Sequence, residues 1–131
     1  MDQFHRYPRP QETGNKCDVR WMTLKSDRIA LSAYPSDNQL LYASTWPFGI
    51  EELDFVPGKE GGKSASGLVP VTAKHGADIK TGNLVQWNID HKQMGLGGDT
   101  SWGRHVHKQY TIPPGEYHYA FIIEPQVVLS K

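Results

Sequence analysis

The sequence has almost no cysteine, no excess of either charge and no long apolar run, and each absence excludes a class of protein. Its 131 residues include one cysteine, Cys17, which cannot form a disulfide within the chain and so gives no sign of an oxidising compartment. Fourteen basic side chains balance fourteen acidic ones, which argues against a nucleic-acid partner. Because no run of about eighteen apolar residues is present, we expect no contact with a membrane.

Alternation of apolar and polar residues takes the place of helical periodicity along most of the chain. The expected strands are Cys17–Lys25, Arg28–Ala33, Gln39–Thr45, Leu84–His91, His105–Ile112 and Glu116–Glu124. One helical turn is expected at Ile50–Leu53. Many short strands with hardly any helix predict an all-β fold, an antiparallel β-sandwich that occupies residues 1–131 as a single domain.

The last two expected strands are predicted to form a hairpin. Pro114 presets the backbone for the first central position of a type II turn, and Gly115 tolerates the positive φ of the second. With these two residues as the loop, Ile112 lies opposite Tyr117, and the large apolar side chains share one face. The alternation also places Cys17 in a strand, where we expect a small, buried apolar residue.

A glycine-rich loop at Gln93–Gly103 is the strongest candidate for a functional site. Its four glycines permit tight backbone angles and a close approach to another surface. Trp102 lies between the third and the fourth of them, and the electron-rich face of an indole can stack on the C–H face of a pyranose. The spacing alone leaves two interpretations of Trp102 open, a sugar platform and a buried anchor.

Other polar residues have weaker patterns. His105 and His107 would share a strand face as a possible chelating pair, but solvated histidines are the favoured interpretation, so no metal site is expected. Glycoside cleavage needs two facing carboxylates, and nothing places Asp90 or Asp99 against a partner, so no catalytic residue is assigned in this chain. The polar turn Arg9–Asn15 is expected to be structural.

Several motifs, in the same order along the chain, resemble the terminal domain of glycoside hydrolase family two β-galactosidases. NIDHKQMGLGGDTSWG (residues 88–103) is similar to a signature of that domain, and RPQETGNKCDVRW (residues 9–21) resembles a motif at its middle. EELD (residues 51–54) and GEYHY (residues 115–119) also fit the pattern. The resemblance covers the chain from about Tyr7 to Phe121.

The resemblance implies a fold and a division of labour. The family's last domain is a large sandwich of the galactose-mutarotase-like type, a supersandwich, and this chain is similar to its second half, which suggests a fragment. The catalytic glutamates and magnesium ligands of the family lie on a barrel domain that is absent here, so this chain is expected to bind no cofactor. By motif position, Trp102 would contact the galactoside at the mouth of the barrel. The residues that would shape its loop are Gly95, Gly97, Gly98, Asp99 and Ser101.

The expected function is therefore that of an accessory domain of a retaining β-galactosidase that acts on lactose-like substrates. Its implied partners are the galactoside and the barrel of the same polypeptide, and the uncovered half-sandwich suggests a homodimer of the fragment. One alternative is a stand-alone galactoside-binding module that is not an enzyme. Another is a mutarotase-like isomerase that uses His91 or His118. The location, cytoplasmic or periplasmic in a bacterium, stays open.

Overall fold

A computed structural model describes residues 5–8, 11–53, 75–95 and 105–128 of the chain. In that part, six strands and three 3-10 helices are present: β1 (Lys16–Val19), β2 (Met22–Lys25), β3 (Ile29–Pro35), β4 (Leu41–Trp46), η1 (Ile50–Leu53), η2 (Gly76–Asp78), β5 (Gln86–Asp90), η3 (Lys108–Tyr110) and β6 (Phe121–Val127). No helix among these residues has the length and apolar character needed to cross a membrane.

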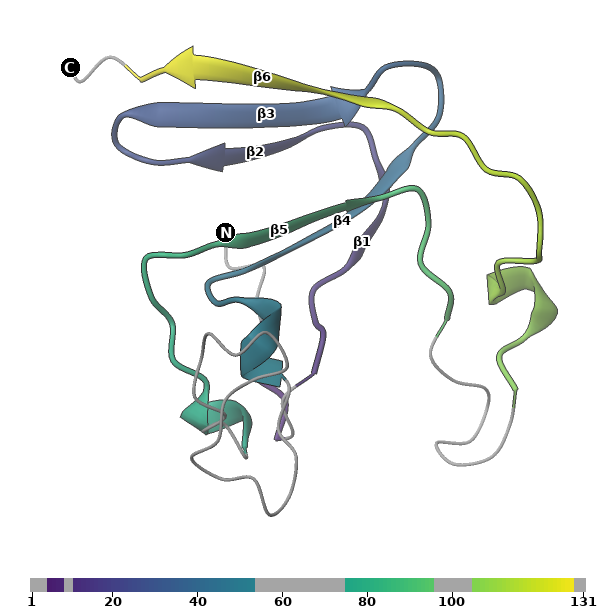
Figure 1. Ribbon diagram of the computed structural model, residues 1–131, viewed down its shortest axis with the longest axis horizontal. Helices are drawn as coiled ribbons and strands as arrows, with labels where there is room; N and C mark the ends of the chain where they lie inside the picture. Colours follow the sequence, from purple (N-terminus) through teal and green to yellow (C-terminus); the bar gives the residue numbers. More distant parts are fainter. Residues whose placement is uncertain (1–4, 9–10, 54–74, 96–104, 129–131) are drawn as a thin grey trace. The chain divides into compact units, whose positions relative to one another are not determined.

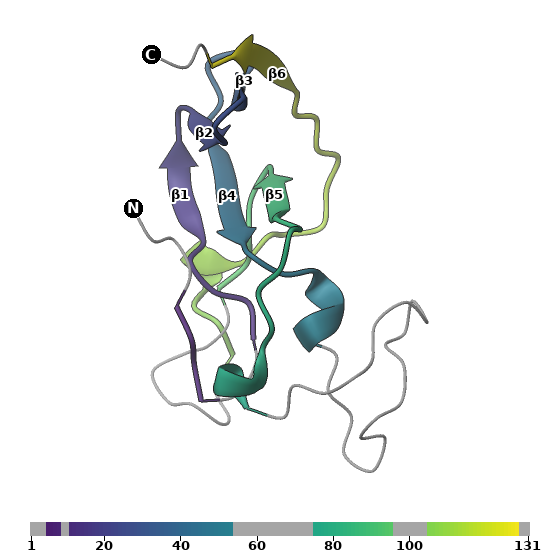
Figure 2. The same ribbon diagram turned by 90° about the vertical axis from the view of Figure 1, so that its left-hand side faces the viewer.

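The strands form two antiparallel sheets of three strands each (Figures 1 and 2). One sheet has the order β1-β4-β5, and the other has the order β2-β3-β6. The predicted all-β class, with antiparallel sheets of the sandwich type, is confirmed. The chain divides into two compact units, Met1–Lys16 with Ala43–Asn88 and Cys17–Tyr42 with Ile89–Lys131.

The first unit has a core built on Trp46. Its side chain is 1% exposed and stacks on Phe48, with ring centroids 5.8 Å apart and planes at 10°. Ile79 is buried in the same cluster, and Leu53 of η1 packs against it. The indole Nε1–H donates a 2.8 Å hydrogen bond to the backbone oxygen of Thr13. The buried indole is therefore both packed and paired, as a buried polar group requires.

Two polar contacts order this unit further. In β5, Asn88 donates to the hydroxyl of Ser44 at 2.9 Å and accepts from Gln86 at 2.9 Å. Ser44 in β4 is 2% exposed, so this chain of hydrogen bonds satisfies a buried hydroxyl. Gln86 and Asn88 were expected to share a strand face, and their contact agrees with that expectation.

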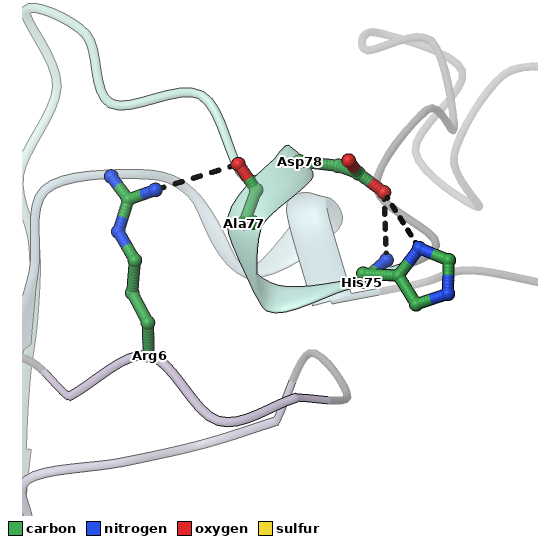
Figure 3. A network of polar contacts seen from close by, with 4 residues as sticks. All are labelled: Arg6, His75, Ala77 and Asp78. Atoms are coloured by element: carbon green, nitrogen blue, oxygen red, sulfur yellow. Dashed lines mark hydrogen bonds and ion pairs between the residues drawn. The ribbon is translucent and has the colours of Figure 1, made fainter.

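The 3-10 helix η2 is held by its own side chains and by the N-terminal segment (Figure 3). A carboxylate oxygen of Asp78 accepts the backbone N–H of His75 at 2.9 Å and lies 3.3 Å from its ring Nδ1. Arg6 Nη1 donates to the backbone oxygen of Ala77 at 3.5 Å. The bond from the His75 N–H to Asp78 is part of a capping box at the start of η2, which satisfies a backbone donor that the short helix leaves unpaired.

In the second unit, β3 is the central strand of its sheet. It pairs with β2 in the register Met22↔Ala33 and with β6 in the register Ala33↔Ile123. On the opposite face, the hydroxyls of Thr23 and Ser32 lie 2.8 Å apart. Such a contact is typical of a pair whose backbones do not bond each other, because those side chains lie closer.

The expected strand Cys17–Lys25 is wrong in extent. The stretch Cys17–Lys25 is divided between β1 and β2, which belong to different sheets, with Arg20 and Trp21 outside both. Asp18, inside β1, has φ 55°, a left-handed conformation that makes this short strand irregular. Cys17 is exposed, so the expected burial of its thiol is also wrong.

The predicted C-terminal hairpin does not form. Residues 105–112 contain η3 in place of a strand, and β6 pairs with β3. Pro113 and Pro114 supply no backbone N–H donors for a ladder. The register with β3 aligns seven residue pairs, from Ile29↔Val127 to Pro35↔Phe121. A long pairing with the central strand β3 therefore replaces the short local one. The helical turn expected at Ile50–Leu53 is confirmed.

Candidate functional site

The candidate site is the glycine-rich loop, of which the structure describes the two ends. Gly95 lies at the first end, after β5, and the chain is described again from His105 onward. The other predicted site residues, which are Gly97, Gly98, Asp99, Ser101 and Trp102, lie outside the described residues. The geometry of the site is therefore that of the base of the loop.

A backbone hydrogen bond closes this base. The N–H of Gly95 donates to the carbonyl oxygen of Tyr110 at 2.8 Å. A Cβ at position 95 would lie 3.0 Å from Cγ1 of Val106 and 3.1 Å from Cβ of Tyr110, closer than side chains normally pack. Glycine at position 95 therefore allows the close approach of the two ends without displacing Val106 or Tyr110.

Each end has its own local support. On the outgoing side, the Gln93 amide donates to a carboxylate oxygen of Asp90 at 3.3 Å. On the returning side, η3 is tied by the N–H of Tyr110, which donates to the His107 oxygen at 2.8 Å. The hydroxyl of Thr111 donates to the Lys108 oxygen at 2.7 Å. Local hydrogen bonds of this kind satisfy the backbone of a turn that has no ladder partner.

An aromatic cluster lies directly after β5. The ring of His91 lies 5.5 Å from that of Tyr117 and 5.6 Å from that of Tyr119, measured between centroids. The hydroxyl of Tyr119 donates to the backbone oxygen of Ile89 at 3.4 Å, and that of Tyr117 donates to the oxygen of Pro113. The segment after the loop is therefore attached to the strand before it.

Sequence reasoning missed this cluster. The predicted hairpin placed Tyr117 opposite Ile112 and gave His91 no contact with either tyrosine. The available signal was the spacing of Tyr117 and Tyr119, two residues apart in an extended segment, which puts both rings on one side. That spacing did not indicate that the ring of His91, 26 residues before Tyr117, would lie beside both tyrosine rings.

The other candidate groups do not form a reactive site. His118 pairs with Glu116 at 3.1 Å, but their side chains are 83% and 86% exposed, where an ion pair has little strength. Asp90 is engaged with Gln93, and its suggested counterpart Asp99 lies outside the described residues. Among the described residues, no group of three or more His, Cys, Asp or Glu side chains could hold a metal ion.

Arg9–Asn15 was expected to be structural, and one contact in its described part supports that role. The backbone oxygen of Thr13 accepts the hydrogen bond of the buried Trp46 indole. Gly14 follows with φ 71°, a left-handed conformation that glycine adopts without steric cost. The motif thus anchors the core of the first unit.

Comparison with known families decides the relationship of the chain. Residues 1–123 match the family described as beta galactosidase small chain. The chain belongs to this family. The match includes both ends of the glycine-rich loop and the segment with Tyr117 and Tyr119.

Curated relatives agree with the family. The chain is 31% identical over 130 residues to the beta-galactosidase of Priestia megaterium and 24% identical over 126 residues to that of Vibrio vulnificus, each match covering 95% of this chain. The beta-galactosidase of Lactobacillus delbrueckii subsp. bulgaricus is 29% identical over 104 residues, which is 79% of the chain. This chain spans about a tenth of the length of these relatives, between 8% and 10%.

Proposed function

We propose that the chain is an accessory part of a β-galactosidase that hydrolyses terminal β-D-galactosides such as lactose, and that it contributes Trp102 to the substrate site. The family match supports the enzyme class. The hydrogen bond from Gly95 to Tyr110, which joins the two described ends of the loop, supports a role for this loop as a unit. A platform held on rigid supports orients a ligand better than a free loop does.

In this proposal, the chain binds and the rest of the polypeptide does the chemistry. A retaining glycosidase uses one carboxylic acid to protonate the leaving oxygen and one carboxylate to attack the anomeric carbon. Both would belong to a barrel domain outside this chain, as would the ligands of a magnesium ion. Trp102 would stack on the aglycone side of the galactoside, and the loss of that stacking should cost about 1 kcal/mol.

The first experiment is a titration of the isolated chain with galactose and with lactose, followed by the indole N–H signals in NMR spectra. The Trp102→Ala variant tests the platform, and Trp21→Ala is a matched control because Trp21 is 70% exposed and belongs to another motif. We expect no saturation up to high millimolar sugar, because the barrel is needed to complete the site. Saturable binding that Trp102→Ala abolishes would instead identify a stand-alone galactoside-binding module.

The second experiment uses a full-length β-galactosidase that contains this chain. Trp102→Ala should raise KM by about fivefold, which corresponds to about 1 kcal/mol, with a smaller change in kcat. Such a pattern is typical of a contact that is equally strong in the ground and transition states. An unchanged KM for lactose would contradict the proposed role of Trp102.

Two partners follow from this proposal. The first is the catalytic barrel of the same polypeptide, since the chain covers about a tenth of its curated relatives. The second, for the chain on its own, is another copy of itself, because a half-sandwich leaves apolar surface uncovered.

A further inference from the structure

The two ends of the glycine-rich loop are attached to each other at a second place besides the hydrogen bond from Gly95 to Tyr110. After the loop and η3, the chain returns to the end of β5, where the ring of His91 contacts the rings of Tyr117 and Tyr119. All five residues belong to the second unit. Both attachments are therefore internal to one compact part of the chain.

The two tyrosine rings are fixed at their hydroxyls as well as at their faces. The ring of His91 lies 5.5 Å from that of Tyr117 and 5.6 Å from that of Tyr119, with planes at 48° and 33°. The hydroxyl of Tyr119 donates to the Ile89 oxygen at 3.4 Å, and that of Tyr117 donates to the oxygen of Pro113. Because the rings are held in this way, the His91 ring sets where the returning segment lies against the end of β5.

The contacts of His91 are contacts of ring packing. Both centroid distances fall within the range of roughly 4.5–7 Å that is favourable for aromatic pairs. The Nδ1 atom of His91 is buried and has no hydrogen-bond partner among the described residues. A phenylalanine ring at position 91 should therefore make the same contacts, whereas alanine should lose both.

A second attachment determines what a single hydrogen bond leaves free. Two segments joined only by the bond from Gly95 to Tyr110 can rotate about it, as at a hinge. His91 lies four residues before Gly95, and Tyr117 lies seven residues after Tyr110, so the second attachment is at a separate point of both segments. Two separate attachments set the orientation of the loop ends as well as their distance, which is how supporting residues position a site.

We propose that His91 is a positioning residue for the loop: through Tyr117 and Tyr119 it orients the two ends from which Trp102 is presented to the galactoside. The part of this inference that concerns the substrate rests on the proposed function, whereas the part that concerns the base of the loop does not. When only a fraction of the molecules holds the competent orientation, the apparent affinity falls by that fraction. Loss of the His91 ring should therefore raise KM and leave kcat nearly unchanged.

The first test is hydrogen exchange of a full-length β-galactosidase that contains this chain, read by mass spectrometry on peptides that include residue 95. The Gly95 amide donates to Tyr110, so its exchange follows the opening of the base. His91→Ala should accelerate this exchange about fivefold, and His91→Phe should restore it to within about twofold of the wild type. His118→Ala is the matched control, because His118 lies between the two tyrosines in sequence but pairs with Glu116, and it should leave the exchange unchanged.

The second test separates an effect through the loop from a general structural effect, using the kinetics of the same variants with lactose. His91→Ala should raise KM about two- to fivefold, and His91→Phe should restore it. In a Trp102→Ala background, His91→Ala should change KM by less than about twofold, because the contact that His91 orients is already absent.

Unchanged exchange in His91→Ala overturns the proposal. Failure of His91→Phe to restore the exchange also overturns it, since the imidazole would then act by a hydrogen bond. Independent effects of His91→Ala and Trp102→Ala on KM overturn the link between His91 and Trp102. The proposed function fails in a different way: if Trp102→Ala leaves KM unchanged while His91→Ala still accelerates the exchange, His91 positions the base but the loop provides no substrate contact.

Discussion

Two apolar regions are built from the same kind of alternating sequence but differ in exposure. One is the core around Trp46, and the other is the face of the sheet β2-β3-β6 that carries Ile123 and Val127, called the open face. Trp46 and Phe48 are 1% and 2% exposed, whereas Ile123 and Val127 are 50% and 78% exposed. Strand alternation fixes which side chains share a face. Whether that face is covered depends on segments far away in the chain, or on another molecule. Energetically, a covered face stabilises the fold and an uncovered one is available for binding.

Removal of Trp46 should have the largest effect. Trp46→Ala should lower the free energy of unfolding by about 3 to 5 kcal/mol, because it empties a buried site and leaves the Thr13 oxygen without its donor. Urea denaturation measures this change. Trp46→Phe keeps an aromatic ring without the Nε1–H and should cost less than the alanine variant. A loss below about 1 kcal/mol for Trp46→Ala would mean that this core is not closed.

A smaller effect is expected at Gly95, where two neighbouring side chains of the second unit lie close to the backbone. Gly95→Ala should cost about 1 to 3 kcal/mol, because the new Cβ would crowd Val106 and Tyr110. Faster hydrogen exchange at the residue 95 amide would report the weakened base of the loop. Gly82→Ala is the matched control, since a Cβ there meets nothing within 4 Å and should change stability by less than about 1 kcal/mol.

Truncation on the open face should have a weaker effect on the monomer. Ile123→Ala, measured at low micromolar concentration, should cost less than about 1 kcal/mol, because half of the side chain is already in water. The same substitution at Ile122 should cost about as much. A loss at Ile123 comparable to that of Trp46→Ala would show that the open face is covered within the monomer and would erase the contrast between the regions.

The smallest effect concerns the half-buried Tyr42 in β4. Burial raises the pKa of its phenol above 10.0, and the nearby Cys17 and Asp18 raise it further. The neutral phenol is thus favoured in the folded chain, and its contribution to stability is present below about pH 10 and is lost as pH rises through the raised pKa. The stability difference between the wild type and Tyr42→Phe should therefore shrink between about pH 9 and pH 11. A difference that stays constant over this range would contradict the raised pKa.

The local parts of the fold could be predicted from the sequence, and the long-range parts could not. The strand at Gln86–Asp90 and the turn at Ile50–Leu53 follow from alternation and from local turn formers. The predicted hairpin around Pro114 was wrong because the turn residues alone do not show that the last strand can instead form seven residue pairs with β3. The expected strand from Cys17 is divided at Arg20 and Trp21, for which the alternation gave no signal.

The candidate site shows the same division. Glycine at position 95 was noted for a possible close approach, and its partner Tyr110 could not be named because that contact is fifteen residues away in sequence. The contact of His91 with Tyr117 and Tyr119 was missed because the predicted hairpin gave these tyrosines a wrong register. The role of Trp102 stays a prediction that rests on its motif.

By itself, the sequence determined the all-β class, the family and the set of side chains that share each strand face, because these follow from residue identity and a two-residue repeat. Tertiary structure alone decided that β6 pairs with β3, that Trp46 is buried and that Ile123 is open to water. The physical reason is that backbone conformation is a local property of neighbouring residues. Burial and strand pairing are set by which distant segments compete for the same face and the same hydrogen bonds.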